Sequence, residues 1–230
     1  MIVRRWLGLD GAIGAFSAAL VSDAAGEPSR SRRGAGSDAL ERGLGLVDEV
    51  LAGVPIATLS GIAVGSGPGT FTGLRIALAY GKSLAFAAGL PLVAVSSYDA
   101  YEPDEPGGPA TPYATFVHGR AGIACMRFRS RDVTETVCGA YAAIAAALGK
   151  LVSPGPLDSY GDAEGVAPAL GERGIIVRPM PQPADSPALA IARRALRGAA
   201  PSRLHALRAD YGERAHYALR AERKGAGLGP

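Results

Sequence analysis

The sequence has few of the residues that hold metals or build disulfide frameworks. Its 230 residues include three histidines and two cysteines, Cys125 and Cys138. The histidines lie far apart and show no His-x-x-x-His or His-Glu-x-x-His spacing, so the sequence supports neither a zinc nor an iron site. The cysteines lack metal-ligand spacing as well. Because nothing suggests a secretory context, we expect both to be reduced thiols rather than a disulfide.

Long apolar runs and excess charge are also scarce. No stretch reaches the roughly 18–20 uninterrupted apolar residues of a membrane span. Asp10 interrupts the apolar run that follows Arg4 and Arg5, which argues against a signal peptide. We therefore expect a cytoplasmic protein without a membrane segment. The net charge of +3 equals the excess of six basic over three acidic residues within 203–224. Such a tail attracts RNA phosphates or is simply a solvated end, and the second explanation is the commoner one.

One stretch is specific enough to carry a functional argument. It consists of an apolar segment, the turn Gly-Ser-Gly-Pro-Gly-Thr-Phe-Thr-Gly at residues 65–73, and a long helical pattern. Gly67 and Gly69 suit a turn that needs positive φ. Thr70 or Thr72 would cap the free amides of the helix. Since a helix amino terminus at the end of a strand commonly holds anions, the stretch predicts either a phosphate-binding turn or a capped connection without a ligand.

Several named motifs do not fit. A P-loop needs a glycine five positions before its Gly-Lys-Ser/Thr, but Ile76 stands there, and Gly-Lys-Ser at 81–83 falls inside the predicted helix. The dinucleotide pattern fails because Thr70 replaces its last glycine. Ser66 has no recognisable base partner, so a catalytic triad is unsupported. Asp10, at a turn between two predicted strands, is the one carboxylate placed to hold a metal-phosphate complex, although turn formation is its commoner role.

The first hundred residues have the pattern of an α/β unit. The predicted elements are strands at 2–9 and 14–21, a loop with a short edge strand at 27–36, a helix at 38–52, a strand from 61 to the turn that begins at 65, a helix at 71–88 and a strand at 90–95. The first two strands form a hairpin, and the last three elements form a parallel crossover unit. Apolar residues cover two faces of the first helix, and small residues dominate one face of the second. Both helices therefore pack inside their own fold or against a partner.

The second half repeats this rhythm after a linker. Residues 102–112 contain four prolines and two glycines, which favours a domain boundary there. The predicted elements that follow are strands at 113–118, 123–128 and 133–138, a helix at 140–148, short strands at 151–152 and 175–177 around a helix within 163–172, and a helix from 187 to about 198. We predict two similar lobes, 1–104 and 105–200, and a basic tail at 201–230 that packs back on the first lobe.

The central motif resembles one protein family closely. The run Gly67-Pro68-Gly69-Thr70-Phe71-Thr72-Gly73-Leu74-Arg75, followed by Lys82 and by Leu90-Pro91-Leu92-Val93-Ala94-Val95, is similar to the TsaB (YeaZ) family. This family belongs to the bacterial machinery that makes threonylcarbamoyladenosine at position 37 of tRNA. The resemblance extends weakly over most of the chain, to the turn at Asp10 and to Leu204–Arg208 near the end.

The resemblance implies a two-lobe, actin-like fold of the sugar kinase and heat-shock ATPase superfamily. This is an α/β, ribonuclease H-like fold with mixed sheets flanked by helices. It also implies a non-catalytic subunit that binds the transferase TsaD, with TsaE joining the TsaB–TsaD pair and tRNA reached through the complex. A homodimer of the free protein is consistent with it. No cofactor is expected.

The same resemblance implies that the partner binds to the helices predicted at 38–52 and 71–88. The first has apolar residues on two faces, and the second has small residues along one face. The residues that we expect at this interface are Leu40, Leu44, Val47, Leu51, Leu74, Ala77, Leu78 and Gly81. Because their side chains are apolar or small, affinity is expected to come from helix packing and to survive raised salt.

The chain departs from the family pattern at two turns. Gly11 and Ala12 stand where hydroxyl residues usually follow the first aspartate, and at residues 118–123 two family carboxylates are missing while Arg120 remains. Hydroxyls are obvious phosphate donors, so their loss argues against nucleotide binding. The second hypothesis is a nucleotide-dependent enzyme, ATPase or kinase-like, that binds ATP and Mg²⁺. Its phosphate-turn residues would be Asp10, Gly67, Gly69 and Thr70.

Overall fold

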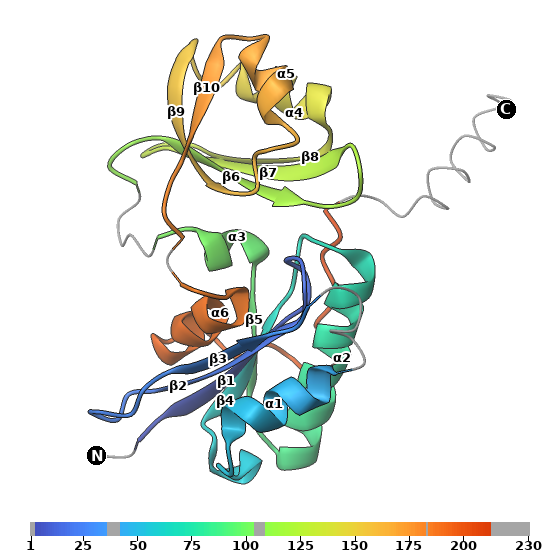
Figure 1. Ribbon diagram of the computed structural model, residues 1–230, viewed down its shortest axis with the longest axis vertical. Coiled ribbons are helices and arrows are strands. Elements are labelled where there is room, and N and C mark those ends of the chain that lie inside the picture. The colour runs from blue at the N-terminus through green and yellow to red at the C-terminus, as the bar shows by residue number, and fades with distance from the viewer. Residues whose placement is uncertain (1–2, 36–41, 104–108, 183, 213–230) are drawn as a thin grey trace, which may run out of the picture.

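Two five-stranded sheets, one in each half of the chain, form two stacked lobes (Figure 1). The computed structural model describes residues 3–35, 42–103, 109–182 and 184–212. The elements of the first half are β1 (Arg5–Asp10), β2 (Ser17–Ser22), β3 (Arg30–Arg33), α1 (Gly43–Leu51), η2 (Ile56–Thr58), β4 (Gly61–Gly65), α2 (Phe71–Ala88), β5 (Leu92–Val95) and α3 (Ser97–Tyr101). Those of the second half are β6 (Tyr113–His118), β7 (Ile123–Arg129), β8 (Thr134–Ala140), α4 (Tyr141–Leu148), β9 (Gly155–Gly161), α5 (Ala167–Gly171), β10 (Ile175–Pro179) and α6 (Pro187–Leu196).

The two sheets have the same topology. The first has the order β3-β2-β1-β4-β5, and the second, read from its other edge, has the order β8-β7-β6-β9-β10. In each, three antiparallel strands are followed by two strands that add in parallel. Parallel strands need crossover connections, which α2 and α5 supply. The predicted α/β fold with two similar lobes and mixed sheets is confirmed.

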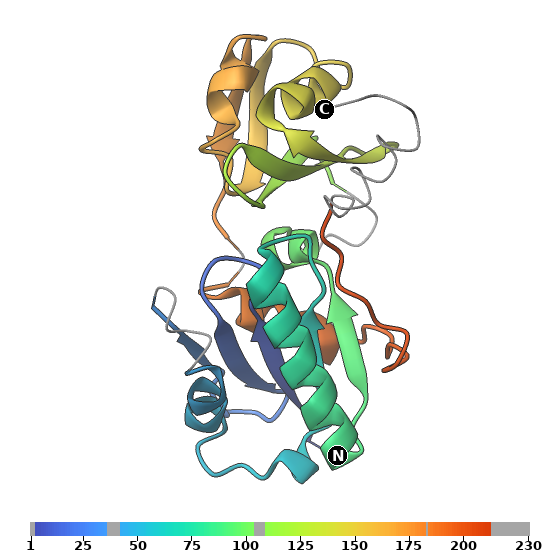
Figure 2. The same ribbon diagram turned by 90° about the vertical axis from the view of Figure 1, so that its right-hand side faces the viewer.

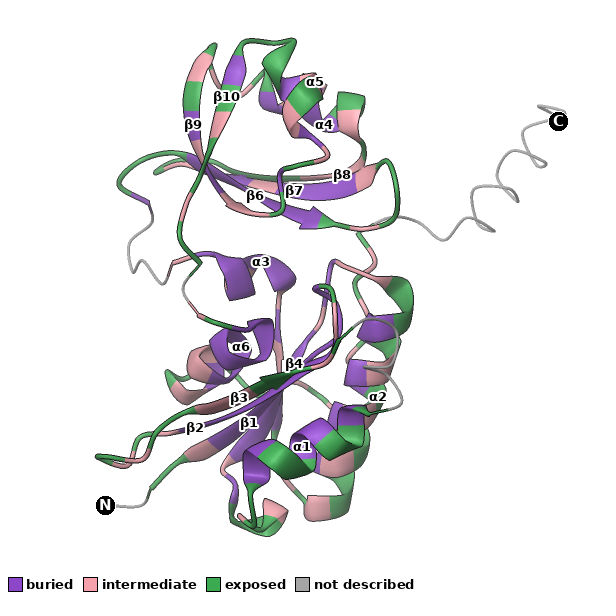
Figure 3. Cartoon of the chain, in the orientation of Figure 1, coloured by how far each residue is buried: buried purple, intermediate pink, exposed green. Residues whose placement is uncertain are grey.

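Helices cover both faces of the first sheet. Helix α2 packs against β4 and α1 against β2, while α6 packs against β1 and β2 from the other side (Figure 1). The central strands β1 and β4 are therefore buried on both faces, as expected for continuous apolar runs (Figure 3). The predicted boundary of the second lobe at residue 200 needs correction, because most of α6 is buried in the core of the first lobe.

Other element boundaries also differ from the prediction. Strand β9 at Gly155–Gly161 replaces the short strand predicted at 151–152, since a turn with a bend occupies those residues. Helix α1 begins at Gly43, and the predicted cap at Asp38 lies outside the described residues. No helix of the described segments is both long enough and apolar enough to cross a membrane.

The expectation of two reduced cysteines is wrong in this structure. Cys125 on β7 and Cys138 on β8 form a disulfide with a sulfur–sulfur distance of 2.05 Å. The two residues are directly opposite each other in the antiparallel ladder, with their Cα atoms 4.0 Å apart. Sequence spacing did not indicate this because it depends on the register of two strands joined by a hairpin.

Residues 201–212, here called the C-terminal strap, run back along the first lobe toward the second (Figure 2). At its start, Ser202 of the strap forms a β-bridge with Leu92 of β5. In its middle, the Leu207 carbonyl accepts a hydrogen bond of 2.6 Å from Lys82 Nζ. Near its end, the Asp210 amide donates a hydrogen bond of 2.8 Å to the Ser66 carbonyl, and Tyr211 stacks on Phe71 with their ring centroids 4.9 Å apart. It thus covers the free edge of β5 and the start of α2. The rest of the predicted tail, residues 213–230, lies outside the described part.

Candidate functional site

The turn predicted from the sequence lies where β1 and β4 end side by side. These strands are parallel and in register, with Leu9 opposite Val64, so Asp10 at the end of β1 neighbours Gly65 at the end of β4. The structure therefore brings all four predicted phosphate-turn residues to one edge of the sheet, although 55 or more positions separate Asp10 from the other three in the sequence.

The loop that follows β1 contacts Thr70, the N-cap residue of α2. The Thr70 amide donates a hydrogen bond of 2.9 Å to the Ala12 carbonyl, and Thr70 Oγ1 donates one of 2.9 Å to the Gly11 carbonyl. Thr70 stands at the N-cap position but its side chain does not cap the helix, contrary to our expectation. These two carbonyls thus accept from the amide and the hydroxyl of Thr70, two donors that a phosphate at this turn could use. The geometry favours the alternative in which the turn is a connection without a ligand.

Two glycines make this close approach possible. A Cβ atom at Gly73 would overlap the Gly11 carbonyl, and one at Gly11 would overlap the Gly73 carbonyl. Backbone lies directly on backbone, so neither side can move as a side-chain end would. This packing fixes the start of α2 against the loop that follows β1.

Gly73→Ala is expected to destabilise the protein by about 1–3 kcal/mol, because the added methyl group meets backbone in a packed site. Gly81→Ala in the same helix is the matched control. Its Cβ would meet Val64 and Leu92 at 3.4–3.5 Å, which is ordinary contact, and alanine favours a helix over glycine by about 1 kcal/mol. Urea unfolding of both variants measures the difference. Equal effects of the two substitutions would contradict the described packing.

Asp10 is a buried carboxylate at the centre of this edge. Its Oδ2 atom accepts a hydrogen bond of 3.0 Å from the Ile13 amide, whereas Oδ1 has no partner among the described residues. Burial raises the pKa of the Asp10 carboxyl to about 6, and the hydrogen bonds from Ile13 and Ala12 and the charge of Arg33 only partly oppose this. The Asp10 side chain mainly stabilises the turn between β1 and β2, because its Oδ2 atom accepts the hydrogen bond from Ile13 within that turn.

The predicted partner-interface residues need a correction. Val47, Leu51, Leu74, Ala77, Leu78 and Gly81 are buried in the protein's own core. Their apolar spacing is explained by packing of α1 and α2 on the first sheet, so they are not available to a partner. Leu40 lies outside the described residues. Leu44, which is 51% exposed, is the one predicted residue in the described part that faces solvent.

A different set of apolar side chains faces outward from the same two helices. Phe86 is 73% exposed and Phe71 is 54% exposed on α2. Gly43 of α1 lies beside Tyr80 of α2, so the two helices present neighbouring outer surfaces (Figure 3). We call Leu44 and Phe86 the outer helix face, and leave out Phe71 because Tyr211 of the strap stacks on its ring. The sequence pattern concealed it because both sides of each helix carry apolar residues.

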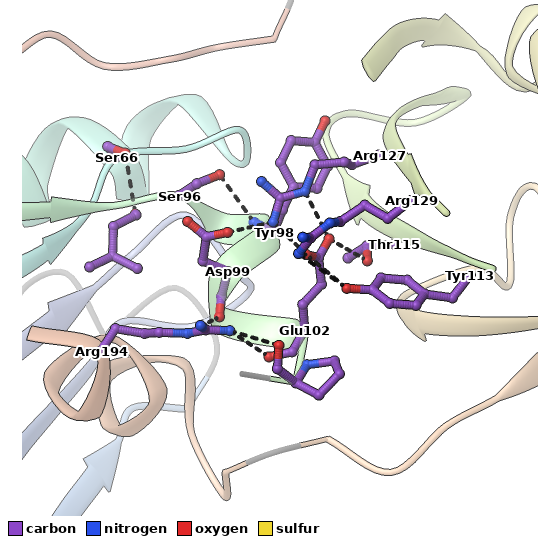
Figure 4. A network of polar contacts seen from close by, with 12 residues as sticks. Ser66, Ser96, Tyr98, Asp99, Glu102, Tyr113, Thr115, Arg127, Arg129 and Arg194 are labelled. Carbon is purple, nitrogen blue, oxygen red and sulfur yellow. Dashed lines mark hydrogen bonds and ion pairs between the residues drawn. The ribbon is translucent and has the colours of Figure 1, made fainter. Parts of the chain in front are cut away.

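A network of polar side chains lies between the lobes, and no pattern in the sequence predicted it. The buried Glu102 carboxylate accepts hydrogen bonds of 2.8 Å from Thr115 Oγ1, 3.2 Å from the Tyr113 hydroxyl, 2.8 and 2.6 Å from Arg127, and 3.2 Å from Arg129 (Figure 4). The four donors come from β6 and β7, while Glu102 follows α3. Although burial lowers it, the hydrogen bond and charge of Glu102 raise the pKa of Arg127 above its usual value.

Arg194 of α6 ties the same segment to the first lobe. Its guanidinium donates to the backbone carbonyls of Asp99, Glu102 and Pro103 at 3.2, 2.9 and 3.1 Å (Figure 4). The segment after α3 is therefore held from above by the second sheet and from below by α6. The segment after α3 is thus a point of contact shared by the two lobes.

Comparison with known proteins decides the family. The model of the family described as TsaD, tRNA N6-adenosine threonylcarbamoyltransferase, matches residues 37–160, which is more than half of the chain. The chain belongs to this family. TsaB of Haemophilus influenzae is 39% identical over 62 residues, which are 26% of each protein. The TsaD protein of Maricaulis maris is 46% identical over 59 residues, or 25% of this chain and 16% of that protein.

Solved structures agree with this assignment at the level of the fold. YeaZ from Pseudomonas aeruginosa matches with a TM-score of 0.68 and 22% identity, over 90% of this chain and 99% of that one. The predicted resemblance to the TsaB (YeaZ) family and its fold is confirmed, and the TsaB relatives are described as tRNA threonylcarbamoyladenosine biosynthesis proteins. The sequence matches to curated TsaB and TsaD proteins span about a quarter or less of those proteins.

Proposed function

We propose that this TsaB-family protein is a non-catalytic subunit that binds a TsaD protein and supports its threonylcarbamoyl transfer to tRNA. The observation that carries the proposal is the contact between the loop after β1 and Thr70 at the amino end of α2. In this turn the carbonyls of Gly11 and Ala12 occupy donors that would otherwise bind a nucleotide phosphate. The motif therefore sets the position of α2 instead of forming a catalytic site.

The outer helix face supports a role in binding. Phe86 and Leu44 project apolar side chains into solvent from helices whose opposite sides are firmly packed in the core. Large apolar side chains in such positions are typical anchors of protein interfaces. Because the helices are fixed by the core and by the Gly11–Gly73 contact, the face is preorganised, which lowers the entropy lost on binding.

Phe86→Asp and Leu44→Asp are each expected to weaken binding of TsaD from the same organism by about thirtyfold or more, the effect of losing an interface anchor worth about 2 kcal/mol. Ile176→Asp is the matched control, because Ile176 is 65% exposed on β10 in the other lobe. Calorimetry at low and high salt measures the dissociation constants, and the wild-type value is expected to change little with salt.

Absence of a complex with TsaD, or equal losses in Phe86→Asp and Ile176→Asp, would overturn the proposal. Circular dichroism of each variant separates lost binding from lost folding. Titration with Mg-ATP in the same calorimeter tests the enzyme hypothesis, which would require tight binding that disappears in Asp10→Ala.

A further inference from the structure

The disulfide lies at the junction of three segments. Cys125 is 3% exposed and packs with the core cluster of the first lobe, although β7 belongs to the second sheet. Cys138 is half-buried, with its sulfur 3.9 Å from the Tyr98 hydroxyl of α3. The bond closes only 13 positions of sequence, and the β7–β8 ladder already holds both strands. Joining distant parts of the chain is therefore not its contribution.

The end of the C-terminal strap rests on this disulfide. Gly212 has φ of +69°, and a Cβ there would overlap Cys125 Sγ, lie 2.6 Å from Cys138 Sγ and lie 3.2 Å from Pro68. Two residues earlier, the Asp210 amide is bonded to the Ser66 carbonyl. One side of Gly212 thus lies against the sulfur atoms and the turn that precedes α2, while its other side is exposed, and it fits there because it has no side chain.

We propose that Cys125 and Cys138 form a redox-active site that takes dithiols as its reductant, and that the disulfide holds the C-terminal strap in place. Two thiols need more room than one disulfide, since non-bonded sulfur atoms lie farther apart than bonded ones. On reduction the added volume falls on Gly212, which has no free space on the side of the sulfur atoms and is exposed on the other. The strap end is displaced, and Tyr211 leaves the ring of Phe71.

The exchange begins at the more accessible sulfur. A thiolate of the dithiol attacks Cys138 Sγ and forms a mixed disulfide, while Cys125 Sγ leaves as a thiolate and takes up a proton. The second thiol of the reductant then displaces Cys138 Sγ, which is protonated in turn. The protein gains two electrons and two protons, and the dithiol becomes a cyclic disulfide. In reducing compartments, protein disulfides are usually of this transient, redox-sensing kind.

The experiment compares the oxidised and dithiothreitol-reduced full-length protein. After incubation with oxidised glutathione, alkylation and mass spectrometry are expected to show no free thiol, and after dithiothreitol two. Tryptic cleavage after Arg208, which is exposed on the strap, is expected to be about tenfold faster in the reduced protein, because proteolysis follows local opening. Two free thiols under oxidising conditions, or equal cleavage rates, would overturn the proposal.

Variants separate the sulfur contact from general loosening. The double variant Cys125→Ser, Cys138→Ser is expected to be cleaved at the reduced rate with or without dithiothreitol. Gly212→Ala is expected to be cleaved quickly even when oxidised. Gly26→Ala is its control, because Gly26 has φ of +79° with open space around it. Equal cleavage of the two alanine variants would contradict the contact. Since no partner protein is needed, the outcome does not depend on TsaD binding.

Discussion

Glu102→Gln is expected to lower the free energy of unfolding by about 3–5 kcal/mol, which is the usual effect of removing one partner from a buried ion pair. The Glu102 side chain is 0% exposed and that of Arg127 is 16% exposed. Glutamine keeps the shape of the glutamate side chain but loses its charge. Its NH₂ group also places hydrogen-bond donors beside the donors of the two arginines. Arg129 then loses the counter-charge of Glu102, and Arg127 keeps only that of Asp99, whose side chain is 40% exposed.

Thermal unfolding followed by circular dichroism measures this effect as a fall of about 10 °C in Tm, given a shift of about 2–4 °C per kcal/mol for a chain of this length. Asp23→Asn is the matched control. Asp23 pairs with Arg4 at 2.8 Å, but their side chains are 28% and 55% exposed, so the Tm of this variant should stay close to that of the wild type. A Tm for Glu102→Gln as high as that for Asp23→Asn would contradict the role of the network.

The buried Asp10 carboxyl is expected to make stability depend on pH with a definite sign. Burial raises its pKa to about 6 in the folded protein from the usual value of 3.8. As the pH rises above about 4, the unfolded chain loses this proton first and is favoured. The folded state keeps the proton until about pH 6. The contribution of Asp10 to stability is therefore greatest below pH 4 and is lost by pH 7, a difference of about 3 kcal/mol.

Asp10→Asn removes the titrating group while keeping an oxygen that accepts from Ile13. Urea unfolding from pH 4 to pH 8 should show that the variant gains about 3 kcal/mol on the wild type across this range, because other titrating groups cancel in the comparison. A carboxyl carbon resonance of Asp10 that titrates near pH 6 is the direct measurement. A constant difference between the two proteins, or titration near pH 4, would contradict the burial of an unpaired oxygen.

The order of secondary-structure elements and the family could be predicted from the sequence because both depend on local patterns. Alternation of apolar residues, the proline-glycine turn and the small-residue helix are properties of short windows. The motif around Gly67 and Gly73 is specific enough to identify the family. The repeated succession of strands and helices predicted two lobes of the same topology, and the two sheets do have the same strand order.

What each feature packs against was decided only by the tertiary structure. Helical spacing showed that α1 and α2 carry apolar residues on more than one side, but not which side meets the sheet. For that reason Val47, Leu74 and Ala77 were assigned to an interface although they are core residues. The exposed Phe86 became distinguishable from them only once the sheet had covered one side of each helix.

The same reason explains the features that the sequence did not reveal. The Glu102 carboxylate meets donors 11–27 positions away, α6 returns to the first lobe across the whole second lobe, and Cys125 meets Cys138 through strand register. The turn after β4 shows it most clearly. Its sequence predicts a helix start suited to an anion, and only the parallel pairing of β1 with β4 delivers the Gly11 and Ala12 carbonyls that take the place of the anion.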